Sequence, residues 1–135
     1  MSDLNQICSE VAASVPDGLG CAVIDLESGL LIGVSRQANA LPESLLDTMA
    51  ATVVEMVRGR TITIVEEMIA EYTGTKQGRL VDGLQLTTDQ AYVFMSVLQE
   101  KPNYLVALVA GKKATLGSGW AAIRSALPKI MPFCP

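Results

Sequence analysis

The sequence of 135 residues contains no histidine, and only 4% of its residues are aromatic and 18% charged. Without histidine, the chain has no imidazole to act as a general base near neutral pH. Its 10 basic residues are scattered among 14 acidic ones, which gives a formal charge of −4. Because nucleic-acid binding needs a basic face, we expect no nucleic-acid partner.

Targeting and membrane-spanning patterns are also missing from the sequence. The first residues lack the basic and apolar regions of a signal peptide, and no apolar run approaches the length of about 18 residues that spans a bilayer. We therefore expect a cytoplasmic protein that does not insert into membranes.

The three cysteines match no CxxC spacing, so we expect neither a zinc site nor a disulfide framework. Cys8 and Cys21 fall within apolar stripes, and we interpret them as small buried side chains. Cys134 lies near the end of a proline-broken apolar segment, and it is the cysteine that we expect to be exposed.

Apolar residues make up 50% of the chain, which is enough to build one hydrophobic core. We expect a single domain over residues 1–135, with its core at about 3–128 and a tail at 129–135 that drapes over the surface. Hydrophobic periodicity divides this domain into helical and extended segments. The expected helices are 4–15, 43–58, 61–72 and 116–127. The expected strands are 21–24, 30–32, 84–87, 91–98 and 104–110.

Three of these segments carry the main structural expectations. Residues 61–72 have the β-branched composition of a strand but the apolar spacing of a helix, and we favour a helix after Gly59. Residues 73–83 are polar and rich in glycine, which indicates an exposed loop. Pro128 should end the last helix. Short turns make consecutive strands antiparallel neighbours, so we expect a five-stranded antiparallel sheet between helices, in the order α-β-β-α-β-β-β-α.

The second helix, at residues 43–58, has more apolar surface than one sheet would cover. Its apolar side chains span an arc of about 180°, whereas packing on a sheet needs about 100°. We interpret the excess as a subunit interface, with Met49 and Val53 on the exposed part of the arc. The alternative is that a neighbouring helix of the same chain covers it.

One glycine-rich segment could suggest nucleotide binding. Gly117, Gly119 and Ala122 fit the pattern G-x-G-x-x-A between a strand and a helix. Only 13 residues follow Ala122, however, which is too few for the second parallel strand and acidic residue of a dinucleotide-binding unit. We expect instead that these glycines let the last helix pack closely on the sheet.

Two pairs of carboxylates could in principle carry acid–base chemistry or hold a metal ion. Asp25 and Glu27 form one pair, and Glu66 and Glu67 form the other. Neither pair has a second ligand cluster or a basic partner at a recognisable spacing, so we expect solvated turn and helix surfaces. The residues therefore predict no catalytic, cofactor-binding or metal site, and favour a module that binds other proteins.

Taken together, three segments of the sequence resemble a known family, the roadblock/dynein light chain family. The resemblance lies in residues 15–32, in the long second helix and in residues 104–120, and it spans about residues 3–128. Its most specific pieces are Pro16-Asp17-Gly18 and Leu116-Gly117-Ser118-Gly119. It implies a profilin-like three-layer α/β (α+β) sandwich with strand order 2-1-5-4-3, and first and last helices on one face.

The resemblance also implies a homodimer in which the second helix and the third strand meet their symmetry mates. Such proteins regulate or scaffold Ras-like small GTPases without being catalytic themselves, so that GTP and Mg²⁺ belong to the GTPase and this chain needs no cofactor. A second hypothesis is a nucleotide-independent adaptor in a motility or signalling complex, and a third is a small-molecule hydrolase or sensor. The residues expected at the interface are Leu45, Met49, Val53, Met56, Leu84, Gln85, Leu86 and Thr87.

Overall fold

The computed structural model describes residues 3–38, 41–75 and 81–135. Five strands form one antiparallel sheet, and its order β2-β1-β5-β4-β3 confirms the predicted order. The strands are β1 (Gly18–Asp25), β2 (Leu30–Val34), β3 (Gly83–Thr87), β4 (Ala91–Val97) and β5 (Tyr104–Gly111). The helices are α1 (Leu4–Ala13), α2 (Glu43–Arg58), α3 (Arg60–Thr73) and α4 (Leu116–Ile130), followed by a 3-10 turn at Met131–Phe133.

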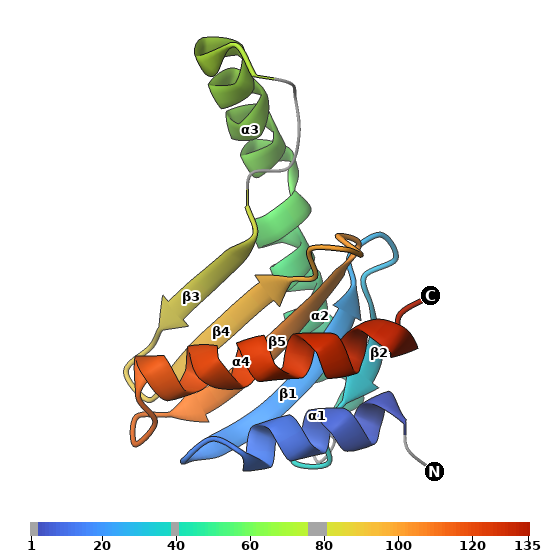
Figure 1. The fold of residues 1–135 in the computed structure, drawn as a ribbon, viewed down its shortest axis with the longest axis vertical. Helices are drawn as coiled ribbons and strands as arrows, with labels where there is room; N and C mark the ends of the chain where they lie inside the picture. Colours follow the sequence, from blue (N-terminus) through green and yellow to red (C-terminus); the bar gives the residue numbers. More distant parts are fainter. Residues whose placement is uncertain (1–2, 39–40, 76–80) are drawn as a thin grey trace.

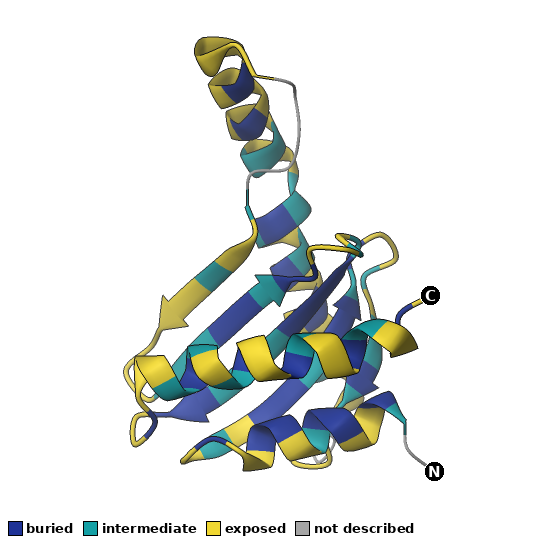
Figure 2. Ribbon diagram, viewed as in Figure 1, coloured by how far each residue is buried: buried dark blue, intermediate teal, exposed yellow. Residues whose placement is uncertain are grey.

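Helices cover both faces of the sheet, and Figure 1 shows α1 and α4 on the near face with α2 behind it. Neighbouring residues of one strand point to opposite faces. Phe94 therefore packs in the core beneath α1 and α4, while Met95 packs in the core beneath α2. The strands β4 and β5 lie inside the sheet and contain no exposed residue, as their apolar sequences predict (Figure 2).

The segment 61–72 is helical, as the apolar spacing predicts, and it lies within α3. Gly59 interrupts the two helices with an extended backbone conformation, and a β-carbon at this position would overlap the carbonyl oxygen of Glu55. Gly74 ends α3 in a left-handed conformation with φ of 71°, which an L side chain would disfavour. Of the loop predicted at 73–83, residues 76–80 lie outside the described residues.

The prediction that Pro128 ends the last helix is wrong, because α4 continues to Ile130 with the proline inside it. Proline lacks the N–H group that would bond four residues back, so it weakens this last turn. Ile130 is fully buried in the core between α1 and α4. Burial of this side chain offsets the missing hydrogen bond. Hydrophobic periodicity alone does not reveal that burial.

The expectation of an exposed Cys134 on a surface tail is also wrong. Its side chain is buried in the same core as Cys8 and Cys21. The ammonium group of Lys101 donates hydrogen bonds to the carbonyl oxygens of Met131 and Cys134, and so holds the end of the chain against the turn before β5. The three cysteines are distant in sequence but belong to one core.

Candidate interaction surface

One side of α2 faces away from the core and carries large apolar side chains. Leu45 and Met49 are 44% and 42% exposed, so this part of the predicted arc lies at the surface. Val53 does not, because it is only 9% exposed and packs with Val57 in the core beneath α2. Placing Val53 on the exposed part of the arc was wrong, since the arc is wide enough for Val53 to face the sheet.

Met56 lies on the same side of α2 as Leu45 and Met49, which precede it at helical spacing. It is half-buried and packs against the core beneath α2, as does Leu84 of β3. Met56 and Leu84 therefore cover the same core, on the same face of the sheet. We call Leu45, Met49 and Met56 the α2 flank.

The strand β3 forms one edge of the sheet, as its alternating sequence predicts. Within the described residues it pairs only with β4, so its other edge is open for backbone hydrogen bonds. Leu86 shares the α2 face with Leu84, whereas Gln85 accepts a hydrogen bond from the indole N–H of Trp120 at 3.2 Å on the other face. Thr87 is exposed at the end of the strand.

A further set of exposed apolar residues lies on α3 and was not predicted from the sequence. Figure 1 shows this helix projecting beyond the sheet, and Figure 2 shows most of its surface exposed. Its large exposed side chains are Ile64, Val65, Met68, Ile69 and Tyr72. The helical spacing in this segment was visible, but spacing cannot tell an outward apolar face from an inward one.

The prediction that Glu66 and Glu67 share a solvated surface is wrong for Glu66, which lies on the opposite side of α3. Glu66 is only 3% exposed, and one of its carboxylate oxygens accepts a hydrogen bond from the Val81 N–H at 3.4 Å. Glu67 is exposed. Glu66 thus links α3 to the chain that returns to β3, which is a structural role.

Charges are distributed unevenly along α2 and α3. The first half of α2 contains Glu43 and Asp47 and no basic residue. Both arginines of the two helices, Arg58 and Arg60, lie at their junction, where Glu55 leaves a net charge of +1. Arg58 donates a hydrogen bond to the carbonyl oxygen of Pro102 at 3.0 Å, so it also ties α2 to the turn before β5.

Asp25 is the last residue of β1, and Glu27 lies in the turn that joins β1 to β2. Desolvation raises the pKa of Asp25, but hydrogen bonds from the Ser28 N–H, the Asn103 amide and the Glu27 N–H outweigh it. The net effect is a pKa of Asp25 below its ordinary value. This carboxylate fastens the turn to the start of β5, so its geometry is that of a structural residue.

Two of the buried thiols, those of Cys21 and Cys134, have a pKa above the ordinary value. A hydrogen bond with Cys8, together with burial, raises the pKa of Cys21 well above its ordinary value. Burial also raises the pKa of Cys134, although the charge of Lys101 acts in the opposite direction. Since the thiolate is the reactive species, neither cysteine is set up as a nucleophile.

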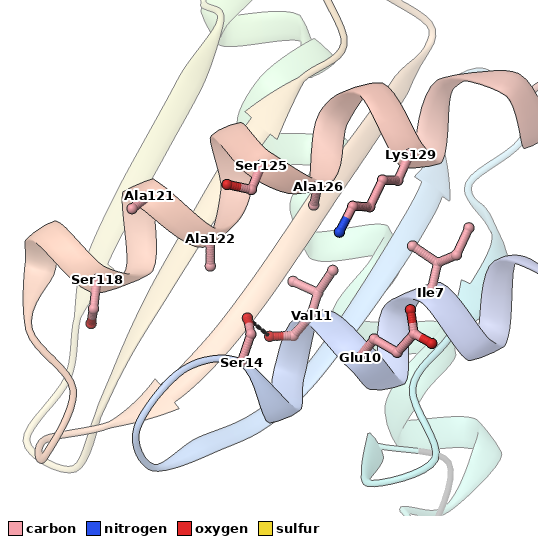
Figure 3. A pocket seen from close by; sticks show the side chains of 10 residues that line it. All are labelled: Ile7, Glu10, Val11, Ser14, Ser118, Ala121, Ala122, Ser125, Ala126 and Lys129. Atoms are coloured by element: carbon pink, nitrogen blue, oxygen red, sulfur yellow. Dashed lines mark hydrogen bonds between the residues drawn. The ribbon is translucent and has the colours of Figure 1, made fainter.

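A groove of about 400 Å³ lies between α1 and α4 (Figure 3). Small and apolar side chains dominate its lining, and Glu10 and Lys129 are its charged members. Its Ser14 hydroxyl donates a hydrogen bond to the Val11 carbonyl at 2.7 Å. This arrangement provides no activated nucleophile, so it lends no support to the hydrolase hypothesis.

Two other kinds of feature are absent from the part of the chain that the structure describes. Over residues 3–38, 41–75 and 81–135, no three cysteine, aspartate or glutamate side chains converge as metal ligands would. Among the same residues, none of the helices combines the length and the apolar character needed to cross a membrane.

No protein-family model matches the chain, and no curated protein matches it either. The chain does match solved structures. The Roadblock/LC7 domain from Streptomyces avermitilis aligns with a TM-score of 0.71 and 19% identity, covering 98% of each chain. MglB from Myxococcus xanthus gives a TM-score of 0.69 and 12% identity, covering 96% of this chain and 92% of MglB.

A third similar structure is the gliding protein MglB from Thermus thermophilus, with a TM-score of 0.69 and 16% identity. It is matched over 95% of this chain and 85% of its own. At these identities the likeness is one of fold. With the predicted strand order, helices on both faces and nearly complete coverage, the chain has the Roadblock/LC7 fold.

Proposed function

We propose that the chain is a non-catalytic homodimer that regulates or scaffolds a Ras-like small GTPase. The observation that carries the dimer is the exposed apolar α2 flank together with the open edge of β3, whose Leu84 packs on the same core as Met56 of α2. A two-fold axis at this edge would pair β3 with its symmetry mate and cover Leu45 and Met49. Fully burying an exposed side chain of this size contributes about 1.5–3 kcal/mol, and covering the exposed part of Leu45 and Met49 contributes a fraction of that, which favours association.

The GTPase partner is proposed from the family resemblance and from the kind of surface that the fold offers. The candidate surface is apolar and presents no constellation of catalytic residues, which suits a binding platform. The likeness to a gliding protein is consistent with a role in motility. In this proposal the nucleotide and its Mg²⁺ belong to the partner, and this chain binds no cofactor.

The mass of the protein in solution tests the dimer. We expect about twice the chain mass of 14.3 kDa for the wild type, and the mass of one chain for Met49→Asp. An unpaired carboxylate in a buried interface costs several kcal/mol, so dissociation should be evident. Ala51→Asp is the matched control, because Ala51 is exposed on another side of the same helix. A wild-type monomer, or a dimer unaffected by Met49→Asp, would rule out this interface.

Affinity capture from native lysate, once with GDP and once with a non-hydrolysable GTP analogue, tests the partner. A small GTPase enriched in only one nucleotide state is expected. Partners that bind equally in both states would instead support the second candidate, a nucleotide-independent adaptor of a motility or signalling complex. Failure to bind any GTPase in either state would eliminate the regulator.

A further inference from the structure

The two edge strands of the sheet, β2 and β3, differ in what lies against their outer side. Just after β2, the Ser35 N–H donates a hydrogen bond to the carbonyl oxygen of Cys21 in β1 at 2.8 Å. Because the N–H groups of successive residues in a strand point to opposite edges, those of Val34 and Arg36 point away from the sheet. Another strand would pair with N–H groups in this position.

Two side chains of α1 already accept hydrogen bonds from these outward N–H groups. The Val34 N–H donates to Oδ1 of Asn5 at 2.9 Å. The Arg36 N–H donates to Oγ of Ser9 at 2.8 Å. The Ser9 hydroxyl in turn donates to the carbonyl oxygen of Asn5 at 3.0 Å, so its hydrogen does not compete for the same place. We call Asn5 and Ser9 the edge cap.

A close contact between α1 and β2 holds the edge cap within reach of the strand. A β-carbon added at Gly33 would lie 2.6 Å from Cγ of Leu4, so the glycine lets α1 approach β2 closely. Leu4 is buried in this contact and immediately precedes Asn5. Figure 1 shows the end of β2 beside α1.

The sequence of β2 itself contains none of the residues that commonly prevent strand pairing. Leu30–Val34 reads LLIGV, without a charge or a proline. Uncharged apolar edge strands of this composition pair readily with other chains. A register shift opposite Val23 and Ile24 disturbs the first half of the strand, so the edge cap covers the half that remains regular.

The outer side of β3 carries no comparable cap. The Thr88 N–H donates to the carbonyl oxygen of Ala91 at 2.8 Å, so by the same alternation the N–H groups of Gln85 and Thr87 point outward. Among the described residues, no side chain accepts a hydrogen bond from either group. The two edges therefore differ in their capacity to pair with another strand.

We propose that the edge cap closes β2 to strand pairing, so that copies of this chain join through β3 alone and assembly stops at the dimer. The proposal rests on the β3 homodimer proposed above and extends it to the other edge. Such a dimer is one continuous sheet with β2 at both ends. If these ends were open, dimers would pair end to end into open chains.

Removal of the edge cap tests the proposal. The double variant Asn5→Ala/Ser9→Ala keeps α1 helical, because alanine favours a helix, and removes both acceptors. We expect light scattering to show species larger than the dimer, with a mean mass that rises with concentration, while the wild type stays dimeric. Gln6→Ala/Glu10→Gln is the matched control and should stay dimeric, because both residues are exposed on α1 at the same four-residue spacing.

Amide hydrogen exchange measures the two hydrogen bonds directly. At the lowest practicable concentration, where the variant is least associated, the amides of Val34 and Arg36 should exchange about fivefold faster than in the wild type, as the loss of one hydrogen bond requires. Equal exchange rates would overturn the edge cap, and so would faster exchange in a variant that remains strictly dimeric. Both results would leave the β3 dimer standing.

A wild-type monomer would instead remove the β3 dimer that the proposal extends. In that case, self-association of Asn5→Ala/Ser9→Ala and not of the control would still support a closed β2 edge. A variant that stays monomeric at every concentration would overturn it.

Discussion

The ring of Phe94 lies so close to Gly119 that a β-carbon added at this glycine would overlap it. Phe94 is fully buried in β4, and its ring also meets that of Trp120 edge-on, with centroids 5.3 Å apart. The glycine thus lets α4 approach the sheet over an aromatic side chain. Gly117, two residues earlier, has nothing within 4 Å of the same hypothetical atom.

We therefore expect Gly119→Ala to destabilise the protein and Gly117→Ala not to. Overpacking a core of this kind costs about 1–3 kcal/mol. Alanine at the exposed Gly117 should be neutral or should stabilise the first turn of α4 by up to about 1 kcal/mol. Urea unfolding of both variants measures the difference, and equal stabilities would show that Phe94 can move aside without cost.

A second prediction concerns the hydrogen bond between Asn103 and Asp25, in which the amide nitrogen lies 2.7 Å from the carboxylate oxygen. Because the pKa of Asp25 is lowered in the folded state, its contribution to stability is present above the unfolded value of about 3.9. This contribution to stability should be lost as the pH falls through the lower pKa that Asp25 has in the folded state.

The free energy of unfolding of Asp25→Asn should accordingly depend less on pH below about pH 4 than that of the wild type. Asn103→Ala should cost about 1 kcal/mol at about pH 7, where the carboxylate is ionised, and less in acid. Denaturant titrations at several pH values measure both effects. A loss at Asn103→Ala that is the same at neutral pH and at about pH 3 would contradict the electrostatic explanation.

The third prediction concerns the end of the chain, where Lys101 binds the carbonyl oxygens of Met131 and Cys134. Lys101→Met removes these hydrogen bonds and should loosen the segment that buries the Cys134 thiol. We expect Cys134 to react with a thiol reagent at least about tenfold faster in this variant, because opening then costs roughly 1.4 kcal/mol less.

Peptide mass spectrometry identifies the modified cysteine. Lys113→Met is a suitable control, since Lys113 is exposed and its backbone, not its side chain, bonds to Asp17. Rapid modification of Cys134 in the wild type would contradict the prediction, because it would mean that Lys101 does not hold the end of the chain in place.

Periodicity and composition predicted most of the fold because they report local preferences. The apolar residues of β4 and β5 mark strands covered on both faces, and alternation in β3 marks an edge. The errors arose where contacts distant in sequence decide the outcome. Pro128 remains helical because Ile130 is buried, and Cys134 is buried because Lys101 holds the chain end.

The candidate surface was predicted less completely than the fold, for a related reason. An arc of about 180° on α2 shows that some apolar residues face outward but not which ones, so Val53 was placed on the wrong side. On α3, helical spacing showed an apolar face without showing that Glu66 is the residue turned inward. Which face of a helix is buried depends on how the rest of the chain packs against it. The spacing of apolar residues carries no information about that packing.

Val53 and Met49 lie one turn apart on α2 and should respond differently to the same substitution. Val53→Asp places a carboxylate in the core beneath α2 and should destabilise the folded chain by several kcal/mol at any protein concentration. Met49→Asp should leave the fold of the single chain intact, because Met49 is 42% exposed there. Its melting temperature should lose the concentration dependence that dimerisation gives the wild type. Thermal melts over a hundredfold range of concentration distinguish the two, and a loss of fold in Met49→Asp would place this residue in the core rather than at an interface.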